Sequence, residues 1–259
     1  MSKKIIAVVN QKGGVGKTTT AINLATALAS IDYRVLLIDL DPQGNASTGM
    51  GVAQRDREFT SYDLLVLDTP IEKVIKKSNI PKIDIIPATV DLSGAELELV
   101  SKANRDLALK NKLSRVVDNY DYILIDCPPS LGLLTVNALV ASRSVLVPLQ
   151  CEFFALEGLS HLLKTVDLVK RKLNPDLEME GVLLTMYDRR YNLTSQVEED
   201  VRGHLGEIVF ETIIPRNVRV SEAPSHGKPA IIYDFKCSGS LAYIKLAKEI
   251  LEKKGKKNG

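Results

Sequence analysis

The chain has 259 residues, of which 45% are apolar and 25% charged, so it can bury a sizeable core as one soluble domain. The net charge of +2 is too small to predict a nucleic-acid partner by itself. Three cysteines without C-x-x-C spacing exclude a disulfide framework and a zinc site. We expect no signal peptide before Ile5, a cytoplasmic location, and one domain over residues 1–259 with a short basic tail at about 252–259.

Short apolar runs alternate with longer helical patterns along the chain. The runs lie at 5–9, 35–40, 122–126, 144–149 and 181–185, and the helical patterns at 17–30, 92–117, 131–139 and 155–173. Runs that are apolar on both faces are typical of strands in a covered parallel sheet. The pattern predicts an α/β fold with a doubly wound, mostly parallel sheet and helices on both faces, in which ligands bind at the carboxyl ends of the strands. Residues 53–82 receive no assignment.

A glycine-rich segment, NQKGGVGKTTT at residues 10–20, follows the first predicted strand and opens the first predicted helix. Glycines 13, 14 and 16 let backbone N–H groups point inward at a phosphate, and the helix N-terminus adds a favourable dipole. Lys17 is expected to contact the β- and γ-phosphates, and the Thr18 hydroxyl to bind Mg²⁺. An ordinary phosphate-binding loop does not require the second lysine, Lys12.

Acidic residues end two further predicted strands. Asp126 closes YILID before two prolines, as expected for a carboxylate that holds the Mg²⁺ shell. Asp39 and Asp41 lie in LLIDLDPQGN, where one carboxylate is suited to orient an attacking water. The structural alternative for all three is an aspartate that caps a helix or forms a turn after a strand.

Five segments together carry a resemblance to a known family: KGGVGKT, LLIDLDPQGNAS, DYILIDCPPSLG, QCEFFALEG and IPRNVRVSEAPSHGKP. They closely resemble the ParA/Soj chromosome-partition ATPases of the ParA/MinD superfamily, whose deviant Walker A motif has the additional lysine. The resemblance spans nearly the whole chain and is weakest at 53–82 and at the last residues. It implies a P-loop NTPase fold and a Mg²⁺-dependent ATPase that forms an ATP-sandwiched homodimer.

The resemblance also implies roles for single residues. Lys12 resembles the lysine that crosses the dimer to the partner's phosphates; otherwise, it is a solvated surface charge. Asp41 resembles the water-positioning carboxylate, with Asp39 as the alternative, so Lys12, Lys17 and Asp41 are the expected catalytic residues. The expected nucleotide-binding residues are Lys12, Gly13, Gly14, Val15, Gly16, Lys17, Thr18, Thr19, Pro215 and Asn217, and the expected metal ligands are Thr18 and Asp126. A ribose or cross-dimer role for Glu152 is weaker, because a glutamate after a strand is solvated by default.

Basic residues gather in the C-terminal third of the sequence. Arg190 and Arg219 match positions that form a DNA surface without sequence specificity in similar ATPases, while such charges alone more often form a solvated face. Further basic residues are Arg189, Arg216, Lys245, Lys248 and the lysines of the tail. The resemblance implies that the ATP dimer binds double-stranded DNA on the nucleoid, and that a ParB-type centromere-binding protein stimulates hydrolysis and release.

Three alternative functions remain at this point. A MinD-like membrane ATPase would use an amphipathic last helix, but we expect its apolar face, formed by Leu241, Ile244, Ala247 and Leu251, to dock on the sheet. An iron–sulfur carrier would need two cysteines in exposed loops, whereas Cys127 and Cys151 are expected to be buried. A scaffold that hydrolyses nothing would have no need for Lys17 and Asp41. We therefore expect no membrane partner.

Overall fold

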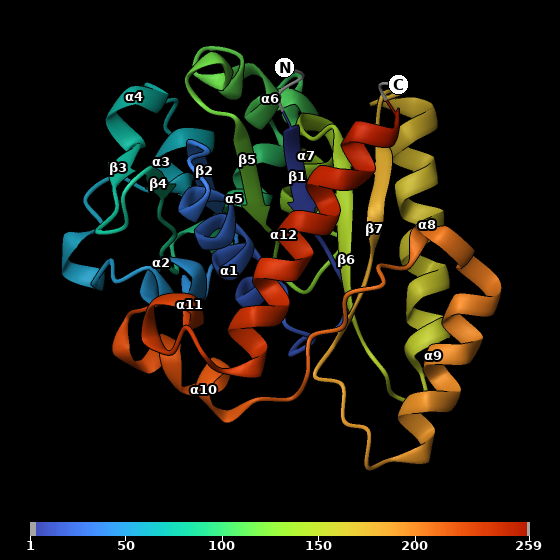
Figure 1. Cartoon of the computed structure of the whole chain (residues 1–259). Helices are drawn as coiled ribbons and strands as arrows, with labels where there is room; N and C mark the ends of the chain where they lie inside the picture. Colours follow the sequence, from blue (N-terminus) through green and yellow to red (C-terminus); the bar gives the residue numbers. More distant parts are fainter. Residues whose placement is uncertain (1–3, 258–259) are drawn as a thin grey trace.

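The protein folds around a seven-stranded sheet in the order β3-β4-β2-β5-β1-β6-β7. This computed structural model describes residues 4–257 (Figure 1). The strands are β1 (Lys4–Val8), β2 (Val35–Asp39), β3 (Lys76–Lys77), β4 (Ile83–Ile86), β5 (Tyr122–Asp126), β6 (Ser144–Gln150) and β7 (Glu178–Thr185). The pairs are parallel except for β3, which runs antiparallel to β4 at one edge. The predicted fold class is confirmed.

Helices cover both faces of this sheet. The α-helices are α1 (Lys17–Ser30), α2 (Asn45–Gly49), α3 (Ser61–Leu65), α4 (Ile71–Val74), α5 (Leu92–Val100), α6 (Ala108–Leu113), α7 (Leu133–Ala141), α8 (Ala155–Lys172), α9 (Asn192–Leu205), α10 (Val218–Glu222), α11 (Ala230–Tyr233) and α12 (Ser238–Lys257). Short 3₁₀ turns are η1 (Gln54–Asp56), η2 (Arg105–Leu107), η3 (Val117–Asn119), η4 (Gly206–Ile208) and η5 (Ala223–His226). Figure 1 shows α1 and α12 side by side on one face of the sheet.

The prediction of one helix over residues 92–117 is wrong. The segment divides into α5, η2, α6 and η3. Asn104 adopts a left-handed conformation with a φ of 56°, which a continuing α-helix cannot contain. The side chain of Asn137 on α7 then holds the new direction, because its Oδ1 accepts from the Leu109 N–H and its Nδ2 donates to the Arg105 carbonyl. Apolar periodicity alone does not reveal this break.

Strand β4 was absent from the predicted strands, and a buried acid explains why. Its sequence, IDII, places Asp84 between isoleucines in a strand whose four residues are all buried. The Asp84 carboxylate accepts hydrogen bonds from the Tyr120 hydroxyl at 2.8 Å and from the Lys77 ammonium at 2.9 Å. A buried carboxylate with two such donors is tolerated in a strand. Residues 53–82 therefore lead into the far edge of the sheet.

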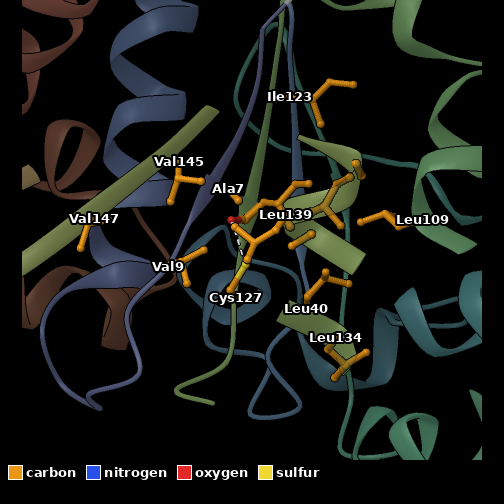
Figure 2. Packing of buried hydrophobic residues seen from close by; sticks show 14 of the residues in the cluster. Ala7, Val9, Leu40, Leu109, Ile123, Cys127, Leu134, Leu139, Val145 and Val147 are labelled. Atoms are coloured by element: carbon orange, nitrogen blue, oxygen red, sulfur yellow. Dashed lines mark hydrogen bonds between the residues drawn. The ribbon is translucent and has the colours of Figure 1, made fainter. Parts of the chain in front are cut away.

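The core consists of two clusters, one on each face of the sheet. Because side chains alternate along a strand, Ala7 of β1 joins one cluster while Ile6 and Val8 join the other. Figure 2 shows the first cluster, in which Cys127 packs among aliphatic side chains. Cys127 and Cys151 are both buried, as predicted. Both faces are thus occupied by packing, which leaves the carboxyl edge of the sheet as the place for polar chemistry.

Helix α12 docks on the sheet as predicted, with Ala247 in the core and Ile244 and Leu251 packed against it, but the buried face is centred on other residues. Leu241 is 50% exposed, whereas Tyr243, Leu246 and Ile250 are fully buried against α1 and the sheet. The Tyr243 hydroxyl lies 3.3 Å from the Thr20 hydroxyl of α1, so one buried hydrogen bond joins the two helices. The backbone of α12 continues to Lys257, so much of the predicted tail is helical; the side chains of residues 254–257 lie outside the described part.

Replacing Gly181 of β7 with alanine is expected to destabilise the fold by about 1–3 kcal/mol, because an added methyl group overpacks the core. A Cβ at this position would lie 2.5 Å from Cε2 of the buried Phe210 ring and 2.9 Å from the Ile208 carbonyl oxygen. Urea unfolding followed by circular dichroism measures the change.

The matched control is Gly203→Ala on α9, where a Cβ meets nothing within 4 Å. Alanine is the better helix former, so this variant should gain about 0.5–1 kcal/mol. Equal stability of the two variants would contradict the packing described for Phe210.

Candidate active site

The parallel register brings three strand ends together at one edge of the sheet. Asp126, the last residue of β5, pairs in register with Val8 of β1 on one side and with Asp39 of β2 on the other. The glycine-rich loop follows β1 directly and leads into α1. Two acidic strand ends therefore lie beside a glycine-rich loop at the start of a 14-residue helix.

The loop is shaped by glycine conformations and by hydrogen bonds at its base. Gly14 and Gly16 have φ values of 74° and 86°, in the left-handed region that favours glycine. The Asn10 amide donates to the Pro148 carbonyl, and its oxygen accepts from the Lys12 N–H at 3.0 Å. The Thr185 hydroxyl at the end of β7 donates to the Val15 carbonyl at 2.8 Å. Hydrogen bonds to Pro148 of β6 and from Thr185 of β7 thus fix the conformation of the loop.

Lys17 lies inside this loop and is nearly buried. Its side chain is 6% exposed, and its ammonium donates to the Lys12 carbonyl at 3.1 Å. Burial lowers the pKa of Lys17 from its usual value, while the charges of Asp126 and Asp41 oppose that shift. The structure therefore brings together Lys17, Asp41 and Asp126, which the sequence assigned to one site.

Asp126 is a buried carboxylate, and neither of its oxygens makes a hydrogen bond of good geometry within residues 4–257, although the Thr18 hydroxyl interacts with it. Burial and the neighbouring charge of Asp39 raise the pKa of Asp126 well above its usual value, and the nearby Thr18 hydroxyl and Lys17 ammonium offset little of that. Buried polar atoms are almost always satisfied in native proteins. Two unsatisfied oxygens beside Thr18 fit a site that a cation completes.

Asp39 and Asp41 have different surroundings. Asp39 is fully buried, and its carboxylate accepts from the Ser47 N–H at 2.8 Å and hydroxyl at 2.7 Å and from the Asp41 N–H. Burial still raises the pKa of Asp39 to about 6. Asp41 accepts from the Gln43 N–H at 3.0 Å and is 7% exposed. Sequence reasoning missed Ser47, although its position eight residues after Asp39 in LDPQGNAS was visible.

Lys12 lies at the outer rim of the loop and forms an ion pair with Glu152, which follows β6. Both side chains are nearly half exposed, at 46% and 43%. The neighbouring Gln11 amide donates to the Gly158 carbonyl of α8 at 3.1 Å. The Lys12 ammonium is therefore paired within its own chain and remains partly accessible to solvent.

Of the two residues expected to contact the base, one has a structural role. The Asn217 side chain caps α10, accepting from the Arg219 and Val220 N–H groups and donating to the Ser238 hydroxyl at 3.0 Å. Pro215 pairs with Tyr187 in an isolated bridge next to β7. A cavity of about 240 Å³ adjoins the loop, and Thr18, Thr19, Asn23, Val220 and Lys228 contribute to its lining.

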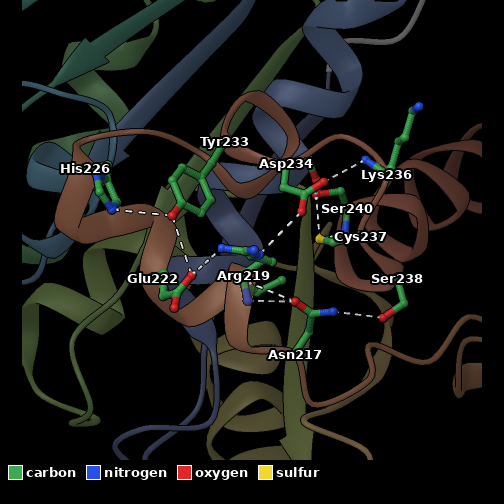
Figure 3. Close-up of polar contacts among 11 residues, drawn as sticks. Asn217, Arg219, Glu222, His226, Tyr233, Asp234, Lys236, Cys237, Ser238 and Ser240 are labelled. Atoms are coloured by element: carbon green, nitrogen blue, oxygen red, sulfur yellow. Dashed lines mark hydrogen bonds and ion pairs between the residues drawn. The ribbon is translucent and has the colours of Figure 1, made fainter.

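The two arginines expected to bind DNA are exposed, and each is paired with carboxylates. Arg190 donates twice to Asp188, at 2.8 and 2.6 Å, and thereby lowers the pKa of Asp188 to about 2. Figure 3 shows Arg219 between Glu222, at 3.1 Å, and Asp234, at 3.6 Å. Both arginines lie on segments separate from the phosphate loop, at 188–191 after β7 and on α10.

No helix within residues 4–257 has the length and apolar character that crossing a bilayer requires. Among the same residues, no group of three or more histidine, cysteine or acidic side chains is arranged to hold a metal ion.

Comparison with known proteins gives one consistent result. The AAA domain family matches residues 3–179. The chain is 56% identical to the chromosome partitioning protein ParA of Caulobacter vibrioides, over 96% of this chain and 94% of that protein. It is 58% identical to the sporulation initiation inhibitor protein Soj of Bacillus subtilis, over 95% and 98%. A cobyrinic acid a,c-diamide synthase from Mycobacterium smegmatis, solved with an ATP analogue and magnesium, superposes with a TM-score of 0.84 at 36% identity, over 96% and 95%.

Substituting Asp126 with asparagine is expected to raise the melting temperature at pH 8, because it removes an unsatisfied buried charge worth about 1–3 kcal/mol. The pKa of Asp126 is higher in the folded than in the unfolded state, so wild-type stability falls as pH rises above about 4. The advantage of the variant should therefore shrink toward pH 5. Differential scanning fluorimetry across this range measures it.

Asp200→Asn, at an exposed position on α9, is the control and should change the melting temperature little. Addition of Mg²⁺ and ATP should stabilise the wild type but not Asp126→Asn. A variant that melts below the wild type at pH 8 would show that Asp126 has a partner in the folded protein.

Proposed function

The chain belongs to the ParA/Soj family of chromosome-partitioning proteins, and we propose that it is a Mg²⁺-dependent ATPase that hydrolyses ATP to ADP and phosphate to drive DNA partitioning. One observation carries the proposal: the buried Lys17 lies within a glycine loop against Asp41 and the unsatisfied Asp126. A buried cation beside inward-facing backbone N–H groups is suited to a phosphate chain.

ATP and Mg²⁺ are the cofactors that this site fits. The loop backbone that surrounds the phosphates consists of Gly13, Gly14, Val15 and Gly16. Lys17 neutralises the charge of the β- and γ-phosphates. The Thr18 hydroxyl and the Asp126 carboxylate are the side chains that would hold Mg²⁺, and phosphate oxygens and water would complete its coordination. The metal supplies charge neutralisation on the phosphates. Thr19 lines the neighbouring cavity with Asn23, which supports the proposal that Thr19 contacts the nucleotide.

Asp41 is the better candidate for orienting the attacking water. Three donors occupy the Asp39 carboxylate, two of them from Ser47, so Asp39 has little capacity left for a water. Asp41 accepts one hydrogen bond, from Gln43, and retains acceptor capacity at the open edge of the sheet. A carboxylate that holds a water in line with the γ-phosphate lowers the barrier by positioning.

Lys12 is proposed to act on the nucleotide of a second subunit in an ATP-dependent homodimer. Its ammonium is nearly half exposed and pairs with Glu152, which a phosphate chain with several charges can replace. A cation supplied from outside the subunit neutralises charge in the transition state, so hydrolysis would wait for dimerisation. Pro215 and Asn217 are proposed to flank the base; Asn217 would do so while still capping α10.

Arg190 and Arg219 are proposed to bind phosphates of double-stranded DNA without reading its sequence, and thereby to place the dimer on the nucleoid. Both are exposed guanidinium groups, which suit bidentate phosphate contacts. A ParB-type centromere-binding protein is the proposed partner that stimulates hydrolysis and release. The membrane alternative is disfavoured, because α12 uses its main apolar face against α1 and the sheet.

Asp41→Ala should bind ATP and form the dimer normally but turn over at least about 100-fold more slowly, because water positioning is lost while the phosphate contacts remain. Radiolabelled ATP hydrolysis and analytical ultracentrifugation in ATP measure the two properties. Lys17→Ala is the comparison variant and should lose nucleotide binding itself. Hydrolysis by Asp41→Ala at the wild-type rate would transfer the role to Asp39 or to solvent.

Lys12→Ala should retain ATP binding by the monomer but lose dimerisation, hydrolysis and DNA binding together.

Arg190→Ala and Arg219→Ala should keep the ATP dimer and weaken DNA binding equally for unrelated sequences. The slope of log binding constant against log salt concentration should be flatter by about 1 for each lost contact. Dimer mass and DNA affinity at several salt concentrations distinguish the two classes. A Lys12→Ala protein that dimerises and binds DNA normally would reduce Lys12 to a surface charge.

A further inference from the structure

Arg57 lies in the segment 53–82, for which no element was predicted, and makes four hydrogen bonds through its guanidinium group. Its Nε and Nη2 donate to the Val52 carbonyl at 3.1 and 2.9 Å. Its Nη1 donates to the Ala88 carbonyl, after β4, and its Nη2 to the Thr48 hydroxyl of α2, both at 2.8 Å. One guanidinium group thus joins the end of α2 to the loop that follows β4.

These contacts continue to the backbone of Asp41 in two further steps. The Thr48 hydroxyl donates to the Gly44 carbonyl at 3.1 Å, and the Gly44 N–H donates to the Asp41 carbonyl at 2.9 Å. The packing is close as well, because a Cβ on Gly44 would lie 2.3 Å from Nη1 of Arg57. Gly44 also has a φ of 62°, which requires glycine or a strained residue there. The turn that carries Asp41 is therefore fitted against Arg57.

The turn and α2 are held by polar contacts from two sides. Helix α2 has five residues, too few to be stable without tertiary contacts. A cavity of about 420 Å³ adjoins the turn, and its lining includes Pro42, Gln43 and Thr48 together with Arg57 itself. Asp39 holds α2 through Ser47 on the inner side. Arg57 is the polar tether on the other side.

We infer that Arg57 is a positioning residue for Asp41: its guanidinium fixes α2 and the preceding turn so that the Asp41 carboxylate meets the water at the γ-phosphate. The inference rests on the proposed function, because it assigns the role through Asp41. Displacement of a catalytic group by about 1 Å can cost about 100-fold in rate. The planar fork explains why arginine is needed, since three acceptors are served from one rigid group.

The test is Arg57→Ala in the full chain, with steady-state hydrolysis of MgATP and the lifetime of the ATP dimer as readouts. We expect kcat to fall about 10- to 100-fold with KM within about twofold, because the phosphate contacts are separate from this network. The ATP dimer should live longer than that of the wild type. Arg57→Lys should not restore kcat, since an ammonium cannot replace the fork.

The matched control is Arg55→Ala, which removes an exposed arginine two residues earlier on η1 and should leave kcat unchanged. A double-mutant cycle with Asp41→Ala separates positioning from general damage: in the Asp41→Ala background, Arg57→Ala should no longer lower the residual rate or lengthen the dimer lifetime. Additive losses, a raised KM, or wild-type kcat in Arg57→Ala would overturn the inference. If Asp41→Ala itself hydrolyses ATP normally, the proposed role of Asp41 fails, and the inference fails with it.

Discussion

The site depends on the parallel pairing of β2 with β5, which sets Asp39 directly beside Asp126 in a buried sheet edge. Two carboxylates at that spacing repel each other and lose their hydration, so the fold has to compensate them. Asp39 is compensated internally by Ser47. Asp126 has no comparably well-formed hydrogen bonds among the described residues, and the Thr18 hydroxyl and the Lys17 ammonium are the groups that favour its charge. The electrostatic need for a further cation at Asp126 is thus a consequence of strand register, and it accounts for both the buried lysine and the proposed metal.

The same register gives the acidic residues different roles. The Ser47 hydroxyl donates to Asp39, so helix α2 lies against the end of β2. The chain between the two elements therefore turns at Asp41, whose carboxylate accepts from the Gln43 N–H. Ser47 also accepts from the Ala88 N–H, so the end of β4 joins this arrangement. Strand β4, which the apolar pattern did not predict, therefore helps to hold the helix that follows Asp41. A buried aspartate that is fully hydrogen-bonded acts as structure, and the less restrained one two residues later is available for chemistry.

Continuous apolar runs predicted the central strands well, because a strand covered on both faces has no polar alternative. The glycine loop and the acids at positions 39 and 126 were equally clear, since glycine conformations and strand ends leave local signals. Strand β4 was missed because Asp84 interrupts its apolar run, and only distant Tyr120 and Lys77 make that acid acceptable. The break at Asn104 was missed because it depends on a capping side chain 33 residues away, at Asn137. Local sequence patterns thus predicted the elements that local interactions determine, whereas β4 and the break at Asn104 depend on contacts between residues far apart in the sequence.

Burial separates two kinds of cation in this protein. Lys17 is enclosed by its own loop, so its environment is fixed by folding. Lys12, Arg190 and Arg219 are exposed and paired with acids of the same chain. Exposed ion pairs contribute little to stability, so a phosphate group that brings more charge and better geometry can replace them. Each acid of the same chain thus holds its cation in an ordered position, and the ion pair is weak enough for a phosphate group to replace the acid. In the proposed cycle, such exchangeable pairs would serve the contacts between molecules that must form and break, whereas the buried lysine would serve the phosphate contact within the subunit.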